Sequence, residues 1–274
     1  MQLSELFADE DYRFHMGLKR GSAASFFRPT AKHDKLLSER RHWLRRDPQT
    51  YSAFLPASEI LLKECLKLAL DWGSISSSQR AALDSIENPD ELGIQLGEVW
   101  EPDYLLLQSD SAGQFQLVGG CVCFPSSWNL SEKIGRPLEF IHGPVPGLNA
   151  QLGRSIDAFL SRLKPDDAWL RHNWGISRSA ELNQHPSREL PRLEASTSLE
   201  HAWLRVERQA LVSLPCSGGV LFAIRIEMHC LAEVKKDEEI AARLARALRS
   251  MPPDVAAYKG LATAGAQLAK ALDG

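Results

Sequence analysis

The sequence lacks a long apolar run and lacks a leader of the secretory kind. A helix that spans a bilayer needs about 18 apolar residues, and no stretch of the chain approaches that length. The first residues, MQLSELFADEDYRF, are acidic and have neither the basic nor the apolar region of a signal peptide. We therefore expect a cytoplasmic protein that has no contact with a membrane.

The sequence also lacks an excess of charge of one sign. Its 32 Lys and Arg residues are balanced by 35 Asp and Glu residues, for a net charge of −3. Domains that bind nucleic acid usually carry a basic patch, and no basic block here alternates with aromatic residues. We expect no nucleic-acid partner. The 274 residues are 44% hydrophobic and 24% charged, which is typical of a globular protein with a sizeable core.

Cysteine is sparse and has no spacing that would suit a metal or redox site. Cys121 and Cys123 are two residues apart, whereas zinc and redox sites typically use a C-x-x-C spacing. The chain also has no GxGxxG dinucleotide motif and no cysteine run of the ferredoxin type. We predict reduced thiols without a metal role at all five cysteines, which are Cys65, Cys121, Cys123, Cys216 and Cys230.

The clearest structural pattern is a pair of apolar runs between residues 201 and 231. The runs 203–211 and 220–228 have the composition of strands, and the sequence PCSGG between them predicts a turn. At a period of two, Arg205, Glu207 and Gln209 share one face of the first strand. Two interpretations follow: a hairpin with one face in water, or a pocket wall that presents a carboxylate among guanidinium groups.

The rest of the chain predicts an α+β fold whose strands lie in the middle of the sequence. Apolar alternation and close hairpin spacing favour one antiparallel sheet from strands near 103–124, 168–176 and 203–228. We expect a single domain with an N-terminal helical extension at about 1–100, a sheet core at about 101–234 and C-terminal helices at 235–274. Helical patterns are found at 36–46, 57–72, 78–86, 89–96, 148–163, 236–248 and 253–272.

Two irregular stretches interrupt this pattern. Three prolines and two glycines surround His142 in RPLEFIHGPVPG, and they predict a stiff, extended loop with the imidazole at its bend. The stretch 177–198 is polar and contains several prolines, so it is either a lid or a surface loop.

Several blocks of the sequence resemble the catalytic, haem-binding subunit of bacterial haem-dependent oxidative N-demethylases and their relatives. The hairpin contributes RVERQ and SGGVLFAIR, and the segment before it contributes AWLRHNWGI. The blocks FPSSW, EKIG and IHGPVPGLN precede these in the order that the family would have, and WLRRDPQTY near the N-terminus is also similar. The resemblance covers roughly residues 12–262.

The resemblance implies a PAS-like fold and a haem-dependent monooxygenase that removes a methyl group from a small amine. Such an oxidation attacks a C–H bond next to nitrogen, which no side chain can do, so the resemblance implies haem b as cofactor. In the family the electrons come from a reductase with flavin and iron–sulfur centres on separate subunits. The present chain has no motif for either centre, so we expect it to depend on such a partner.

We predict roles for five residues on this basis. His142 is the expected axial ligand of the haem iron, because it lies in a matching block and its loop would fix the ring. Glu207 is the expected carboxylate that binds the cationic amine. Arg171, Arg205 and Arg225 are the expected partners of the haem propionates, because guanidinium groups match carboxylates.

Alternatives remain open for each of these predictions. His142 could be a structural histidine, which would leave His172 or His229 as the iron ligand. Glu207 could form an internal ion pair with Arg225. The protein could also be a PAS-like sensor that binds haem or another small ligand without catalysis, or a member of the family that has lost haem, because fold does not fix function.

Overall fold

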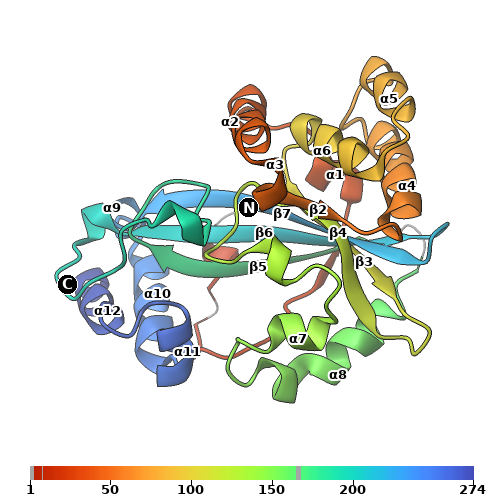
Figure 1. Cartoon of the computed structure of the whole chain (residues 1–274). Coiled ribbons are helices and arrows are strands. Elements are labelled where there is room, and N and C mark those ends of the chain that lie inside the picture. The colour runs from red at the N-terminus through yellow and green to blue at the C-terminus, as the bar shows by residue number, and fades with distance from the viewer. Residues whose placement is uncertain (1–2, 8, 165–167) are drawn as a thin grey trace.

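The protein is built around one seven-stranded sheet. The computed structural model describes residues 3–7, 9–164 and 168–274. The strands lie in the order β1-β5-β6-β7-β3-β4-β2 (Figure 1), and every neighbouring pair is antiparallel. The strands are β1 (Lys19–Gly21), β2 (Ser52–Phe54), β3 (Asp103–Ser109), β4 (Phe115–Cys121), β5 (Ala168–Ser177), β6 (Trp203–Leu214) and β7 (Gly219–Cys230).

Helices from the N-terminal and C-terminal parts of the chain pack on this sheet, so the predicted α+β class is confirmed (Figure 1). Short 3-10 helices cover Leu3–Glu5, Leu130–Glu132, Pro186–Arg188 and Leu199–His201. The α-helices are α1 (Ala23–Phe27), α2 (His33–Arg46), α3 (Pro48–Tyr51), α4 (Ser58–Asp71), α5 (Ser77–Asp84), α6 (Pro89–Val99), α7 (Leu138–His142), α8 (Leu148–Leu160), α9 (Leu231–Val234), α10 (Glu238–Ser250), α11 (Pro253–Tyr258) and α12 (Gly265–Asp273).

The order of the five longer strands agrees with the PAS-like sheet that the resemblance implied. In chain order β3 and β4 come first and β5, β6 and β7 follow, yet the last of them, β7, lies beside the first, β3. The chain therefore crosses the sheet between β4 and β5, and α7 and α8 lie in that crossing. β1 and β2, which the sequence did not predict, extend the sheet at its two edges.

The hairpin of β6 and β7 forms the centre of the sheet and is longer than predicted. The two strands pair continuously from Trp203 opposite Cys230 to Leu214 opposite Gly219. Gly218 has a φ of 68°, a left-handed conformation that glycine adopts at little cost in a tight turn. The buried carboxylate of Glu64 on α4 accepts the backbone N–H groups of Cys216 and Ser217 at 2.8 and 2.9 Å. The turn is thus fixed to the helical layer.

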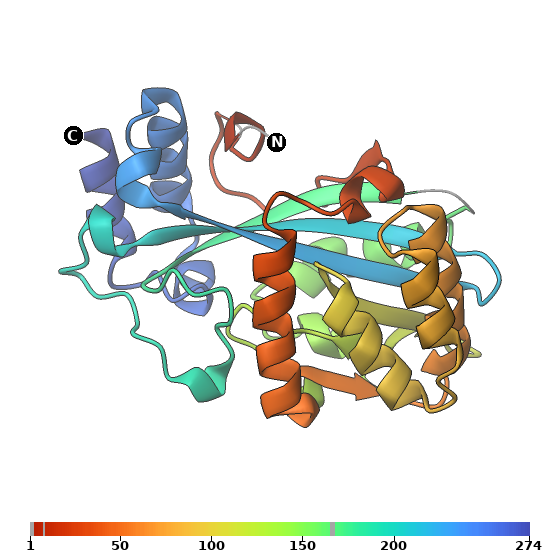
Figure 2. The same ribbon diagram turned by 90° about the horizontal axis from the view of Figure 1, so that it is seen from above.

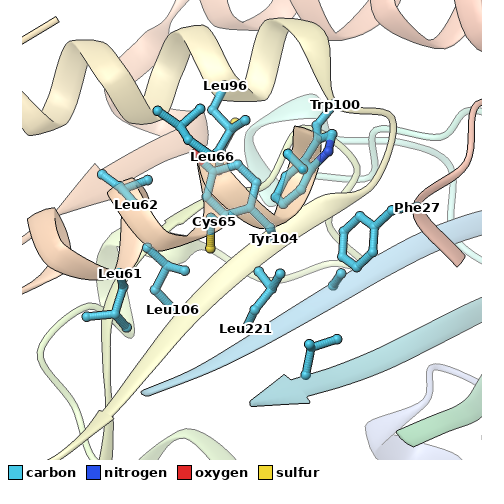
Figure 3. Close-up of a cluster of buried hydrophobic side chains, with 14 of the residues drawn as sticks. Phe27, Leu61, Leu62, Cys65, Leu66, Leu96, Trp100, Tyr104, Leu106 and Leu221 are labelled. Carbon is cyan, nitrogen blue, oxygen red and sulfur yellow. The ribbon is translucent and has the colours of Figure 1, made fainter. Parts of the chain in front are cut away.

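The N-terminal helices cover one face of the sheet, which we call the first face (Figure 1). The helices α4 and α6 bury leucines such as Leu62 and Leu96 against the sheet, with Trp100 and Tyr104 between them (Figure 3). The start of α6 is fixed by Asn88, whose side chain accepts the N–H groups of the first helical turn. Apolar burial of this extent is the main force that holds the two layers together.

The C-terminal helices pack at the far end of the long hairpin (Figure 2). Ala210 and Val212 of β6 belong to the core under the N-terminal helices, whereas Leu204 and Val206 belong to the core under α10 and α12. All four residues have the same parity along the strand, so the right-handed twist of the sheet directs one row of side chains to two helical layers.

The opposite face of the sheet, the second face, is covered by α7 and α8 (Figure 1). A third apolar cluster forms there, in which Leu105, Leu107 and Leu117 of the sheet face Leu138 and Leu160 of these helices. Packing on this face is incomplete, because a cavity separates part of the sheet from the helices.

Several local predictions are corrected. His142 ends the short helix α7, which begins after Pro137, so it does not lie in an extended loop. The helix predicted at 253–272 is two helices, α11 and α12, separated by a turn at Gly260 with a φ of 68°. The stretch 177–198 is not a lid: its Asn183 is buried and donates to the Tyr51 hydroxyl at 2.9 Å, and none of its residues lines the cavity.

Candidate functional site

A cavity of about 350 Å³ lies between the second face of the sheet and the helices α7, α8 and α11. Residues 12–18, which we call the N-terminal segment, close one side of it. Small-molecule sites are typically concave, largely apolar and furnished with a few polar groups, and the cavity fits that description. Apolar side chains that line it include Leu105, Leu107, Leu117, Trp128, Leu138, Ile141, Leu152, Ile156, Phe159, Phe222 and Ile224.

Glu207 is the acidic residue in this cavity, and neutral groups hold it. Its Oε1 accepts the Ser126 hydroxyl at 2.5 Å. Its Oε2 accepts the side-chain amides of Gln209 at 2.8 Å and Asn173 at 3.1 Å. Asn173 is the cross-strand partner of Glu207, and Gln209 follows at the next position on the same face. The carboxylate is therefore oriented without direct contact with a cation of the described chain.

Arg205 acts on Glu207 through Ser126. The Arg205 Nε donates to the Ser126 Oγ at 2.8 Å, and its Nη2 donates to the Phe124 carbonyl at 2.7 Å. The guanidinium is buried, and burial lowers the pKa of Arg205 to about 10, although Glu207 and Asp103 oppose the shift. Arg205 is thus occupied in positioning the segment that carries Ser126.

The same segment is held from the other side by a fully buried ion pair. The Asp103 carboxylate accepts the backbone N–H groups of Cys123 and Phe124 at 2.7 and 2.9 Å. The Arg40 Nη1 from α2 binds Asp103 at 2.5 Å, and both side chains are at most 1% exposed. Burial raises the pKa of Asp103 despite these partners. The FPSSW block of the sequence is therefore an anchored segment that delivers one hydroxyl to Glu207.

His142 lines the cavity from the end of α7. Burial, together with the nearby Arg171 and Lys133, lowers the pKa of His142 to about 4. The imidazole is therefore neutral at physiological pH, and it forms no hydrogen bond with any side chain or backbone group of the described residues. A neutral, unpartnered imidazole on the wall of an apolar cavity is a suitable nitrogen ligand for a metal.

The other histidines are distributed differently. His15 of the N-terminal segment lines the cavity. Burial is the main cause that lowers the pKa of His15, and the positive charge of Arg171 is the second. His172 also borders the cavity, but its cross-strand partner is Arg208, so its side chain belongs to the first face. His229 is outside the cavity lining and lies 3.6 Å from Glu227.

Of the three arginines that were predicted to hold propionates, Arg171 lines the cavity. Burial lowers the pKa of Arg171, and the negative charge of Glu207 opposes that shift. The Arg171 Nε is buried without a hydrogen-bond partner among the described residues. Arg225 projects from the first face, where its Nε donates to the Phe26 carbonyl at 2.8 Å and its Nη1 pairs with Glu101. The ion pair considered between Glu207 and Arg225 is therefore not formed.

Sequence reasoning missed several polar residues of the cavity. Lys133 lies over the Trp128 ring at 5.8 Å, and Lys259 donates to the Trp174 carbonyl at 2.7 Å. Burial lowers the pKa of both lysines. The N-terminal segment could have been found, because Tyr12, Phe14, Met16 and Leu18 alternate with more exposed residues. This is a period-two pattern within the range that we assigned to an N-terminal helical extension.

The part of the chain that the structure describes contains no cluster of three or more His, Cys, Asp or Glu residues that could hold a bare metal ion. A single imidazole suits a metal that brings its own remaining ligands, as haem iron does. Among the described helices, none combines the length and apolarity that crossing a membrane requires.

A comparison with protein families gives a match that includes this cavity. The sequence model of the family described as haem-dependent oxidative N-demethylase, alpha subunit-like, matches residues 74–269. The chain belongs to this family. The recognition from short blocks is thus confirmed, and membership implies a haem-dependent, demethylase-like function. The description of an alpha subunit also implies other subunits.

The matched range of the N-demethylase family contains His142, Arg171 and Glu207. It leaves out the N-terminal segment and α2, although both contribute to the site: the first closes the cavity and the second supplies Arg40. The similarity that we noted in WLRRDPQTY also lies outside the matched range.

Proposed function

We propose that this protein is the haem-binding subunit of a monooxygenase that oxidatively demethylates a small amine. The observation that carries the proposal is Glu207, a carboxylate in an apolar cavity. Neutral donors orient it, and no cation of the described residues is in contact with it. A carboxylate in such a place binds a cation readily, because few water molecules compete for it.

The acceptor positions of Glu207 favour a single bound ammonium group. A carboxylate offers about four lone-pair positions, and the described residues use one on Oε1 and two on Oε2. One position remains, and Glu207 lines the cavity. The donors Ser126, Asn173 and Gln209 fix the direction of that position, so an amine bound there would present its methyl groups to a defined part of the cavity.

The residues present fit haem. His142 offers a neutral imidazole without another partner, and leucine, isoleucine and phenylalanine side chains supply the apolar wall that a porphyrin requires. Lys133, Arg171 and Lys259 are basic side chains at the same cavity, available to carboxylates. When bound, haem supplies the oxidising chemistry that attacks a C–H bond next to nitrogen.

The chain itself contributes binding, orientation and exclusion of water. Glu207 holds the ammonium, and the N-terminal segment and α8 shield the cavity from solvent. Electrons would come from partner subunits with flavin and iron–sulfur centres, because the chain carries neither binding motif.

Expression with a haem precursor, followed by amine titration, tests the proposal. The purified protein should show a Soret band, and dimethylamine or a similar secondary amine should shift it. A colourless protein that also fails to bind added haemin would contradict the proposal. A protein that binds haem but gives no response to amines would favour a PAS-like sensor.

A further inference from the structure

Glu207 and Arg171 lie side by side on the second face of the sheet. Glu207 is opposite Asn173, and Arg171 is opposite Gln209, so the carboxylate and the guanidinium occupy diagonal positions on neighbouring strands. Residues in that relation are about 7–8 Å apart at the backbone, within reach of one small ligand that extends between their side chains. Both side chains line the same cavity.

The two side chains do not pair with each other. No ion pair joins Arg171 and Glu207 in the described structure, and the Arg171 Nε is buried without any hydrogen-bond partner. Elsewhere in the same sheet, opposite charges on neighbouring strands do pair, as in Arg208 with Glu227 at 3.2 Å. Arg171 is half-buried, and a buried Nε–H without an acceptor beside an unpaired carboxylate indicates a place for a ligand.

The surroundings of Arg171 call for negative charge. The described residues that line the cavity include four basic side chains, Arg13, Lys133, Arg171 and Lys259, against the single carboxylate of Glu207. Burial lowers the pKa of His142 and of His15, and the positive charge of Arg171 acts on both imidazoles in the same direction. Arg13 already pairs with Glu10 at 2.9 Å, and a ligand that carried only a cation would bind Glu207 but leave the Arg171 Nε without an acceptor among the described residues.

We propose that the amine substrate is a zwitterion, an N-methylated amino acid. Its ammonium group binds the free position of Glu207, and its carboxylate binds Arg171, whose planar donors match a carboxylate in two hydrogen bonds. The inference rests on the proposed function for the role of Glu207 and narrows the amine to those that also carry a carboxylate. Lys133, beside Trp128 and His142, is left for a haem propionate.

The test compares one ligand that carries the carboxylate with two that lack it. N,N-dimethylglycine carries the ammonium and the carboxylate, 2-(dimethylamino)ethanol has a hydroxymethyl group in place of the carboxylate, and dimethylamine has the ammonium alone. Their affinities are measured by calorimetry and by haem-spectrum titration. The proteins are the parent, Arg171→Gln, Glu207→Gln and the control Arg154→Gln, which removes an exposed arginine of α8 outside the cavity lining.

We expect the parent and Arg154→Gln to bind N,N-dimethylglycine about 10- to 100-fold more tightly than the other two ligands. Arg171→Gln should abolish this preference and keep the affinity for dimethylamine. Glu207→Gln should weaken all three. If Arg171→Gln does not fold, Arg171→Lys, which keeps the charge but not the paired donors, should still reduce the preference.

The proposal of a zwitterionic substrate would be overturned if the parent showed no preference for N,N-dimethylglycine. It would also be overturned if Arg171→Gln kept that preference. The proposal would also fail if Arg171→Gln lost haem to apomyoglobin faster than the parent does, while both proteins lost haem dimethyl ester at the same rate. Arg171 would then hold a haem propionate. A parent that binds dimethylamine but lacks the preference leaves the proposed function standing. A parent that binds no amine overturns both.

Discussion

Two glutamates on opposite sides of the sheet show how differently the same side chain can be used. Glu101 lies beside the first face, and its side chain is 1% exposed. It pairs with Arg225, accepts the Thr30 N–H at 2.6 Å and contacts His33. Glu207 on the second face has only neutral donors, although Arg171 is nearby. The first is a closed network that supports the fold. The second is an open one, and the groups left unpaired indicate where a ligand binds.

The largest effect on the cavity is expected from His142→Ala, which should disturb haem binding. In the proposed function the His142 imidazole binds the haem iron, so we expect its removal to abolish the Soret band or shift it strongly. Far-ultraviolet circular dichroism should change little, because the His142 side chain forms no hydrogen bond with the described residues. His229→Ala, outside the cavity lining, is the control. An unchanged spectrum would move the ligand to His15 or His172, and a collapsed fold would make His142 structural.

Arg40→Ala should break a second closed network, the buried ion pair of Arg40 with Asp103. Arg40 is 0% exposed, and its loss leaves Asp103 buried without its cation, which typically costs about 3–5 kcal/mol. Urea denaturation measures the free energy of unfolding. Arg45→Ala is the matched control on the same helix: its pair with Glu98 is exposed and should contribute about 0–1 kcal/mol. Similar losses for the two variants would refute the distinction between buried and exposed pairs.

The same substitution at the two glutamates sharpens the comparison. Glu207→Gln should retain haem and stability but weaken amine binding by about 10- to 100-fold, the equivalent of about 1.5–3 kcal/mol for a charged hydrogen bond. Glu101→Gln should instead reduce stability, because it leaves Arg225 buried without its counter-charge, and amine affinity should hold. The readouts are titration of the haem spectrum and urea denaturation for each variant. Unfolding of Glu207→Gln would assign that carboxylate to the fold.

The smallest effect concerns pH. The pKa of His142 falls to about 4 in the folded protein, against about 6.5 for an unfolded histidine. The folded state therefore binds fewer protons in that range, and the haem-free protein should lose stability as pH falls from about 6.5 to about 4. His142→Gln removes this contribution, so its urea midpoint should depend less on pH. Parallel profiles for the two proteins would show that the imidazole is not shielded as described.

The central hairpin could be predicted from the sequence because its pattern is local. Alternation at period two is visible in β6 and β7, and it placed Arg205, Glu207 and Gln209 on one face correctly. What could not be predicted is which arginine each glutamate meets. The partner of Arg225 is Glu101, which is 124 residues away in the sequence. Only the register between distant strands and the packing of α1 decide such a pairing.

The prediction for the segment around His142 was wrong for a different reason. We took its prolines as a bar to any regular structure, but Pro137 precedes α7 at its N-cap position and the later prolines follow its end. Proline is compatible with the start of a helix, where its missing N–H has no partner to lose. The N-terminal segment was missed although its alternation is visible in the sequence at Tyr12, Phe14, Met16 and Leu18, because we assigned the whole N-terminal range to a helical extension.

The cavity is closed by two parts of the chain that lie far apart in the sequence, residues 12–18 and α11. The Tyr12 N–H donates to the Ser250 hydroxyl at 2.8 Å, a contact between residues 238 positions apart. Arg246 adds exposed ion pairs to Asp9 and Asp11. Contacts at such separation form late in folding, because closing a long loop costs entropy that only a largely folded chain can offset. We therefore expect haem to enter a largely folded protein, in which the sheet is already formed.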